Sequence, residues 1–167
     1  MAFLAKRPFI YVIVIVAAFV VLLQLSGVLY PQPLGLEITE ATLGTDTIKL
    51  GENTTLTVTV VNRGVEPQTA EVRLMTHAIN LSSTEISLRF YDAVTGERLP
   101  WELEAGNYTA TYPTTRILGS QESWGVPIII ENADPWTFTY TLFVEVHPVN
   151  EQTRSFTTSV QVTVTRE

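Results

Sequence analysis

The fold is decided by residues 50–64, which read LGENTTLTVTVVNRG. Within this stretch Leu56, Val58 and Val60 alternate with polar residues, and a period of two is typical of a β-strand with one buried and one wet face. The triplets Gly-Glu-Asn and Asn-Arg-Gly, which lie on either side of the alternation, are turn-forming. These residues predict one half-buried strand bounded by two turns.

The same alternation recurs along the rest of the chain after residue 35. Its apolar members are Val72 and Leu74; Ile86, Leu88 and Phe90; Phe138, Tyr140, Leu142, Val144 and Val146; and Val160, Val162 and Val164. Turn-forming residues lie between these runs, at 95–97, 105–107 and 132–135. We therefore expect an all-β domain over residues 36–167, an antiparallel sandwich of roughly seven to nine strands.

A long apolar segment precedes this domain. Residues 8–30 are interrupted only by Gln24, Ser26 and Gly27, and a membrane-spanning helix needs roughly 20 mostly apolar residues. Lys6 and Arg7 are the only charges before it. The positive-inside rule then predicts a cytoplasmic stretch 1–7, a transmembrane helix 8–30, a proline-containing spacer 31–35 and an extracellular domain 36–167.

A cleaved secretory signal peptide is the alternative for the same segment, because it too has a basic start and an apolar core. Cleavage after Gly27 would place Leu25 where a small residue is expected, and the apolar run is longer than the ~7–15 residues of a signal core. The sequence favours a retained anchor in contact with membrane lipid.

Composition limits the partners of the outer part. All 17 acidic residues follow Tyr30, with every basic residue except Lys6 and Arg7, so this part carries a formal charge of −9. Nucleic acid is not an expected partner, because binding phosphates requires clustered cations. The chain has no cysteine, which excludes disulfides, thiolate catalysis and thiolate metal sites.

Three N-x-[ST] sequons lie in the outer part, at Asn53, Asn80 and Asn107. They are candidate glycosylation sites and support an extracellular location. Abundant threonine, absent cysteine and a single lysine after Tyr30 are typical of an archaeal envelope protein.

Two stretches carry a family resemblance. Residues 50–64 resemble the opening strands of immunoglobulin-like modules of the CARDB and related envelope type, in which a Gly-Glu turn leads into an alternating strand that ends Asn-x-Gly. Residues 103–110, LEAGNYTA, are similar to the "aGxY" strand entry of such domains. The resemblance implies an immunoglobulin-like sandwich, although the cysteine pair of antibody domains is absent.

The layout of the chain carries a second, purely architectural resemblance. A short cytoplasmic start, one helix and an outside β-sandwich are similar to the stator proteins of the archaellum, the FlaF and FlaG type, which contact the S-layer. This resemblance implies an envelope protein as partner.

No grouping of residues predicts catalysis, a cofactor or a metal site. His77 and His147 are the only histidines, and a blue-copper site would also need a thiolate. The acidic residues Asp92, Glu97, Glu102 and Glu104 could offer oxygen ligands to calcium but lack the dense spacing of a known loop, so a solvated face is favoured. Ser120 and Ser123 have no histidine within twenty residues and no G-x-S-x-G elbow. The chain is predicted not to be an enzyme.

Candidate contact residues fall into two groups. Trp101 and Trp124 adjoin predicted loops, where an exposed aromatic ring would mark an interface, whereas Trp136 is expected in the core. The last strand, residues 155–165, has no charge and no proline, although sheet edges are usually protected by such residues. Either the first strand, residues 36–42, covers it, or a second chain adds a strand beside Val160, Val162 and Thr163.

These observations predict a non-catalytic, single-pass membrane protein whose extracellular sandwich holds or contacts another envelope protein: the surface layer, an appendage or a membrane complex. Homo-oligomers are compatible with the same features. Two alternatives are a subunit of a strand-exchanged extracellular filament and an accessory subunit of a membrane enzyme.

Overall fold

The computed structural model describes residues 35–77, 88–104, 106–133, 137–149 and 155–166. Within those ranges no helix has the length and hydropathy of a membrane span. The predicted cytoplasmic stretch 1–7, the predicted transmembrane helix 8–30 and the spacer up to residue 34 lie outside the described residues.

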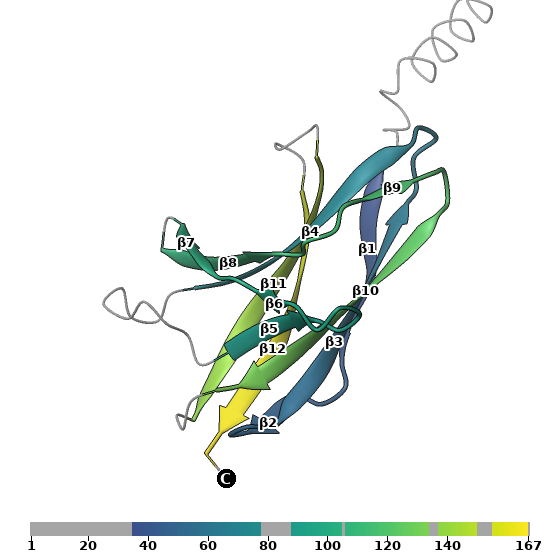
Figure 1. The fold of residues 1–167 in the computed structure, drawn as a ribbon. Helices are drawn as coiled ribbons and strands as arrows, with labels where there is room; N and C mark the ends of the chain where they lie inside the picture. The colour runs from purple at the N-terminus through teal and green to yellow at the C-terminus, as the bar shows by residue number, and fades with distance from the viewer. Residues whose placement is uncertain (1–34, 78–87, 105, 134–136, 150–154, 167) are drawn as a thin grey trace, which may run out of the picture. The chain divides into compact units, whose positions relative to one another are not determined.

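The described residues form two β-sheets (Figure 1). The first sheet has the order β1-β3-β10-β5-β6, with the bounds Leu36–Leu43, Asn53–Asn62, Ser123–Asn132, Leu88–Asp92 and Arg98–Leu99. The second has the order β2-β12-β11-β4-β8-β7, with the bounds Thr47–Lys49, Phe156–Thr165, Phe138–Pro148, Gln68–His77, Asn107–Thr111 and Glu102–Glu104. A short strand β9, Arg116–Leu118, also pairs with β4.

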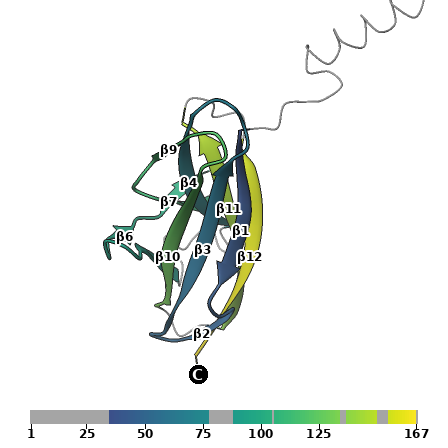
Figure 2. The same cartoon turned by 90° about the vertical axis from the view of Figure 1, so that its right-hand side faces the viewer.

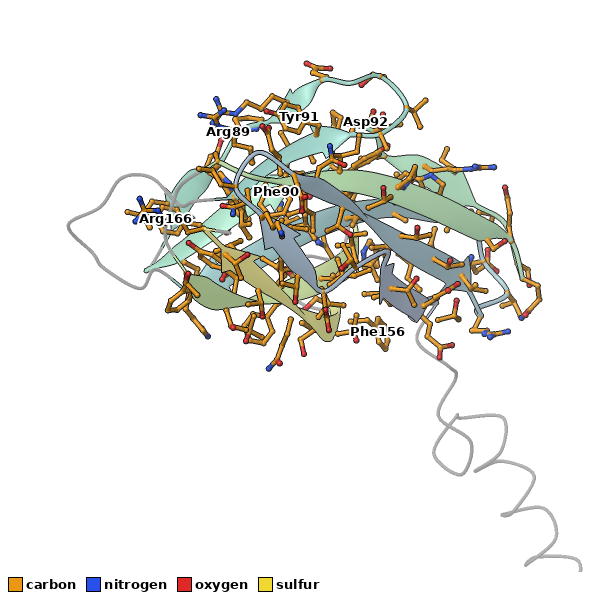
Figure 3. The ribbon with its side chains drawn as sticks, turned by 90° about the horizontal axis from the view of Figure 1, so that it is seen from below. Arg89, Phe90, Tyr91, Asp92, Phe156 and Arg166 are labelled. Carbon is orange, nitrogen blue, oxygen red and sulfur yellow. The ribbon has the colours of Figure 1, made fainter. Side chains whose placement is uncertain are left out.

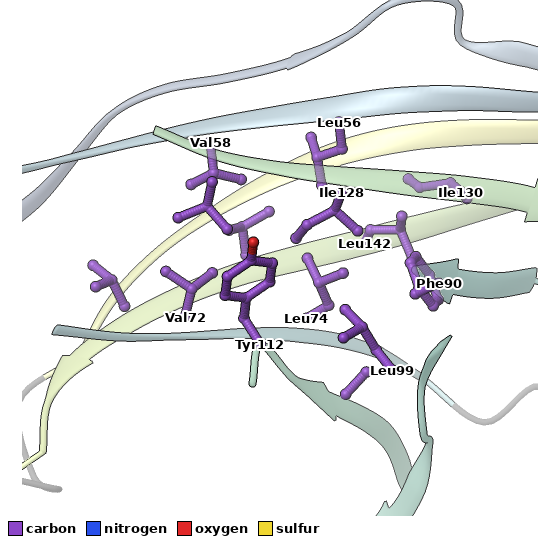
Figure 4. Close-up of a cluster of buried hydrophobic side chains, with 14 of the residues drawn as sticks. Leu56, Val58, Val72, Leu74, Phe90, Leu99, Tyr112, Ile128, Ile130 and Leu142 are labelled. Carbon is purple, nitrogen blue, oxygen red and sulfur yellow. The ribbon is translucent and has the colours of Figure 1, made fainter. Parts of the chain in front are cut away.

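The core lies between the sheets and follows the predicted alternation. Leu56, Val58 and Val60 of β3 are fully buried, and the threonines between them face outward. Opposite them lie Val72 and Leu74 of β4, and Figure 4 shows side chains of both sheets meeting around Tyr112. The prediction of an all-β, two-layer sandwich is confirmed.

Strand order gives the class of sandwich. One sheet joins β1, β3, β10 and β5, and the other joins β4, β11 and β12, which is the arrangement of strands A, B, E, D and C, F, G in immunoglobulin domains. All strand pairs are antiparallel except β2 with β12. One feature departs from the antibody order: the chain forms β5 and β6 in the first sheet before it returns to the second as β7 and β8.

Twelve strands are present among the described residues, more than the seven to nine that alternation indicates. The additional ones, such as β2, β6, β7 and β9, have two or three residues each, and so short a segment shows no period. The predicted turns around Gly51 and Gly96 are where expected. Gly51 and Gly96 have φ of 79° and 74°, a left-handed conformation that glycine adopts without steric cost.

Of the two predicted alternatives for the last strand, edge pairing with the first strand is not observed. β1 pairs with β3 in the first sheet from Leu36 to Leu43, and it lies beside β12 without pairing with it. After β1 the chain crosses between the sheets through a turn in which the Thr54 hydroxyl accepts a hydrogen bond from the Thr45 amide. β2 then pairs in parallel with β12, but only along Thr163, Val164 and Thr165.

Candidate interaction site

One long strand of the described structure, β12, has an edge segment that is open to another strand. On one side β12 pairs with β11 from Phe156 to Val164 without a register shift. On its other side β2 pairs with the last three residues of the strand. Between Phe156 and Val162, no described strand pairs with that second side.

The direction of the backbone groups follows from one hydrogen bond. The Thr163 amide donates to the Asp46 carbonyl, 2.7 Å away, so it points away from β11. In a regular strand the N–H and C=O of one residue point the same way, and this direction alternates along the chain. The backbone groups of Thr157, Ser159 and Gln161 therefore point to the open edge, whereas those of Thr158 and Val160 pair with β11.

The side chains of this edge are neutral. Thr157, Ser159 and Gln161 are exposed on the outer face of the second sheet, and no charged residue occurs between Ser155 and Thr165. The neighbouring edge strand β1 differs, since it presents Glu37 and Glu40 and has a register shift between Ile38 and Glu40. Charges and bulges are devices that prevent strand addition, and β12 has neither within its described residues.

An apolar seam accompanies the open edge. Phe156 and Val160 of β12 face the core but are only half-buried, as are Ile38 and Leu43 of β1. Figure 2 shows β12 along one margin of the sandwich with β1 beside it. Figure 3 shows Phe156 on the opposite side of the domain from Asp92. The four side chains define the seam, which a further strand added to β12 would cover.

The predicted contact residues of β12 have different surroundings. Val162 is fully buried in the core, Val160 belongs to the seam, and Thr163 lies where β2 already covers the edge. The Thr163 hydroxyl lies 3.0 Å from that of Thr139. The sequence prediction thus identified the strand, but the edge groups belong to Thr157, Ser159 and Gln161. The sequence signal for these residues was their place among the outward-facing members of the alternation. Side-chain direction and amide direction both alternate along a strand, so residues that share one also share the other. Because the outward-facing Thr163 directs its amide to the edge, the other outward-facing residues do so too.

The two tryptophans are not on the open surface that the sequence suggested. Trp124 is only 7% exposed and its ring packs edge-on against Tyr112. Trp101 is half-buried, lies edge-on to Phe90 and donates its indole N–H to the Leu88 carbonyl. Trp124 therefore belongs to the core, whereas Trp101 packs against the core and keeps part of its surface exposed. Trp136 lies outside the described residues.

The sequons differ in accessibility. Asn53 is exposed at the start of β3. Asn107 is half-buried at the start of β8, and its Oδ1 lies 2.7 Å from Nδ1 of His77. Asn80 lies outside the described residues.

The two histidines lie apart and have separate partners. His147 is buried, and its Nε2 lies 3.0 Å from Oε1 of Glu71, which also accepts a hydrogen bond from Arg73. His77 is six residues from Glu71 on the same strand, about 20 Å along it. They are not brought together as ligands, and the described residues contain no group of three metal-ligating side chains.

Asp92, one of the acidic candidates for calcium, is a structural carboxylate instead. It is 2% exposed and accepts hydrogen bonds from the Tyr112 hydroxyl, the Val94 amide and the Thr95 hydroxyl. Burial alone would raise the pKa of Asp92, but these hydrogen bonds outweigh it and leave the pKa below its ordinary value. Its oxygens fasten the β5–β6 turn to the core, and no sequence spacing pointed to Tyr112 as the partner.

The described residues form an immunoglobulin-like β-sandwich in which part of the β12 edge is open. No family model matches the chain, and none of the curated proteins matches it. Among solved structures it is similar to AvmM, which catalyses macrocyclization in alchivemycin A biosynthesis, with a TM-score of 0.57 and 9% identity over 80% of this chain and 90% of that one.

It is also similar to the alkylpurine DNA glycosylase AlkC of Pseudomonas fluorescens, with a TM-score of 0.50 and 13% identity over 78% of this chain and 30% of that one. A third similar structure is the CARDB domain of the PF1109 protein of Pyrococcus furiosus in complex with di-metal ions, with a TM-score of 0.45 and 16% identity over 79% of this chain and 94% of that one. Likeness at such identities shows the fold alone.

Proposed function

We propose that the protein is a non-catalytic, membrane-anchored scaffold whose extracellular sandwich contacts another protein of the cell envelope. The apolar segment 8–30 supplies the anchor, and the sequons and acidic composition support the outer location. Candidate partners are the surface layer, an appendage or a membrane complex.

The observation that carries the proposal is the open edge of β12. Three residues direct unpaired backbone groups to it, its side chains are neutral, and an apolar seam runs beside it. Proteins that recognise others by strand addition use such an edge, where main-chain hydrogen bonds give affinity and neighbouring pockets give specificity. A filament subunit would use the same edge, so strand exchange between copies is the second candidate function.

Co-purification from the protein's own host tests the proposal. The full chain, tagged at its carboxyl end, is extracted from membranes in mild detergent after chemical crosslinking, and bound proteins are quantified by mass spectrometry. An untagged strain is the control. The scaffold proposal expects an envelope protein in near-stoichiometric amount, and it expects a protein crosslinked near residues 155–162, either that envelope protein or a second copy of the chain. Recovery of the chain alone from crosslinked membranes would contradict it.

Glycan mapping tests the outer location separately. Asn53 is exposed beside a turn, so we expect a glycan there first, with Asn107 less fully occupied because His77 holds its side chain. Peptide masses from native membranes decide this. Unmodified masses at Asn53, Asn80 and Asn107 would remove the support that the sequons give to an extracellular domain.

A further inference from the structure

We infer that the occupant of the open edge is a second copy of this chain, whose β12 pairs antiparallel with the first about a twofold axis at Ser159. This inference rests on the proposed contact function and gives the occupant of the β12 edge, so that an envelope partner contacts another surface of the paired domains. Symmetric pairing of one strand with itself is isologous, so the same patch serves both subunits and the assembly closes as a dimer.

The register follows from which backbone groups are available. With the axis at Ser159, Ser159 lies opposite Ser159 of the second copy, and Thr157 lies opposite Gln161. All are residues whose N–H and C=O point to the edge, so each pair exchanges both hydrogen bonds. An axis at Gln161 would oppose Ser159 to Thr163, whose edge β2 already occupies. An axis at Thr158 or Thr157 would leave Gln161 opposite residue 155 or 153, both beyond the end of β12. An axis at Val160 would oppose Thr157 to Thr163, whose edge β2 already occupies.

A buried side chain holds β2 in place beside the end of β12, and this favours the axis at Ser159.

 Nδ2 of Asn132, which is fully buried on β10, donates to the Thr165 carbonyl of β12 and to the Ile48 carbonyl of β2. β2, which covers the end of β12, is thereby held to strands of both sheets. The open stretch of β12 therefore extends from Phe156 to Val162.

The neutral side chains of β12 make this edge suitable for contact between two identical acidic chains. The chain carries a formal charge of −7, so most faces of one copy repel those of another. The edge strands β1 and β7 present Glu37, Glu40 and Glu102, and like charges directly opposite each other destabilise a strand pair. Along β12 every residue that faces its counterpart is neutral, so self-pairing there meets no like-charge contact between opposed side chains.

Pairing also covers the apolar seam. On the core-facing side of the joined sheets, Thr158 lies opposite Val160 of the second copy, and Phe156 lies opposite Val162. Phe156 and Val160 are the members of the seam on β12 and are half-buried in the single chain. Removing their apolar surface from water favours association.

Cysteine crosslinking tests the register directly, because the chain has no cysteine of its own. In a hydrogen-bonded antiparallel pair the opposed Cα atoms are about 5.5 Å apart, within the range that a disulfide spans. The full chain carrying Ser159→Cys is oxidised mildly in detergent at low protein concentration. Thr57→Cys, at an exposed position on the inner strand β3, is the matched control. We expect roughly tenfold more disulfide-linked dimer for Ser159→Cys, because pairing raises the effective concentration.

Mixed samples fix the orientation. Chains with Thr157→Cys should crosslink to chains with Gln161→Cys, and neither should crosslink efficiently to itself. Adding Ser159→Pro to both chains should reduce the mixed crosslink to the level of the Thr57→Cys control, because proline removes an edge-directed N–H. Self-crosslinking of Thr157→Cys above the mixed pair, or a mixed crosslink that persists with Ser159→Pro, would overturn the inference.

Failure of the inference differs from failure of the proposed function. If Ser159→Cys crosslinks no better than Thr57→Cys, the second copy is overturned as occupant of the edge. The scaffold function fails separately, when the tagged chain is recovered from crosslinked membranes without an envelope protein.

Discussion

Asp92 shows how single residues hold the sandwich at the end of β5. Its carboxylate is buried, yet three donors on the turn and on Tyr112 compensate for the lost water. The Tyr112 ring in turn packs against Trp124. Burial, followed by the hydrogen bond to the Asp92 carboxylate, raises the pKa of Tyr112, so the hydroxyl keeps the proton that it donates.

Replacing Tyr112 by phenylalanine tests this arrangement. Tyr112→Phe removes a donor to a buried carboxylate, and we expect a loss of about 1.5–3 kcal/mol in the free energy of unfolding. Tyr91→Phe is the matched control, because the Tyr91 hydroxyl donates to Glu131 from a less buried position. Urea unfolding of the full chain in detergent, followed by tryptophan fluorescence, measures both. Equal losses for the two variants would contradict the structural role of Tyr112.

The lowered pKa of Asp92 predicts a pH dependence of stability. The folded-state pKa lies below the ordinary value of 3.8, so the unfolded chain binds more protons between the two values. The stabilisation is fully present above pH 3.8 and is lost as the pH falls through the folded-state pKa. Unfolding measured at successive pH values should therefore show a steeper acid loss for the natural chain than for Asp92→Asn. Parallel acid profiles would contradict the assignment.

At the scale of elements, alternation predicted the long strands β3, β4, β11 and β12 correctly because one face of each is buried. Leu56, Val58 and Val60 are an example. The ten-residue strand β10, however, was not among the predicted runs. Alternation could not predict β2, because three residues carry no period and their pairing depends on the distant Asn132 amide. It also placed Trp124 near a loop, whereas the residue lies in β10 and faces the core.

The sequence predicted which strand forms the candidate site, but it did not predict which backbone N–H and C=O groups of that strand point to the open edge. The uncharged run 155–165 was visible in the sequence. Which residues face the edge depends on the Thr163 amide, whose partner Asp46 is more than a hundred residues earlier in the chain. Pairing between such distant segments is decided by tertiary packing, which local sequence patterns do not encode.

Adjacent prolines test the alternation of backbone groups along β12. Ser159→Pro removes an N–H that points to the open edge, so we expect less than about 1 kcal/mol of destabilisation in the single chain. Thr158→Pro removes an N–H that pairs with β11, and a broken ladder hydrogen bond should cost roughly 2–3 kcal/mol. Urea unfolding at low protein concentration compares the two. A larger loss for Ser159→Pro would reverse the assigned directions.

At the scale of the whole molecule, the proposed scaffold requires that segment 8–30 remains attached as a membrane anchor. The long apolar run and the poor cleavage site around Gly27 predict that segment 8–30 is retained. The intact mass of the protein from native membranes measures this. A mature chain that begins between Val28 and Gln32 would contradict the anchor and indicate a secreted or filament subunit.

The central claim is that the open edge of β12 is occupied in the native assembly, and hydrogen exchange at single amides tests it most directly. Membrane extracts and diluted single chains are labelled, and the amides of residues 157–161 are read by fragmentation mass spectrometry. In the single chain, Thr157, Ser159 and Gln161 should exchange rapidly, while Thr158 and Val160, paired with β11, stay protected. In the assembly all five should be protected. The same alternating pattern in both samples would contradict the claim.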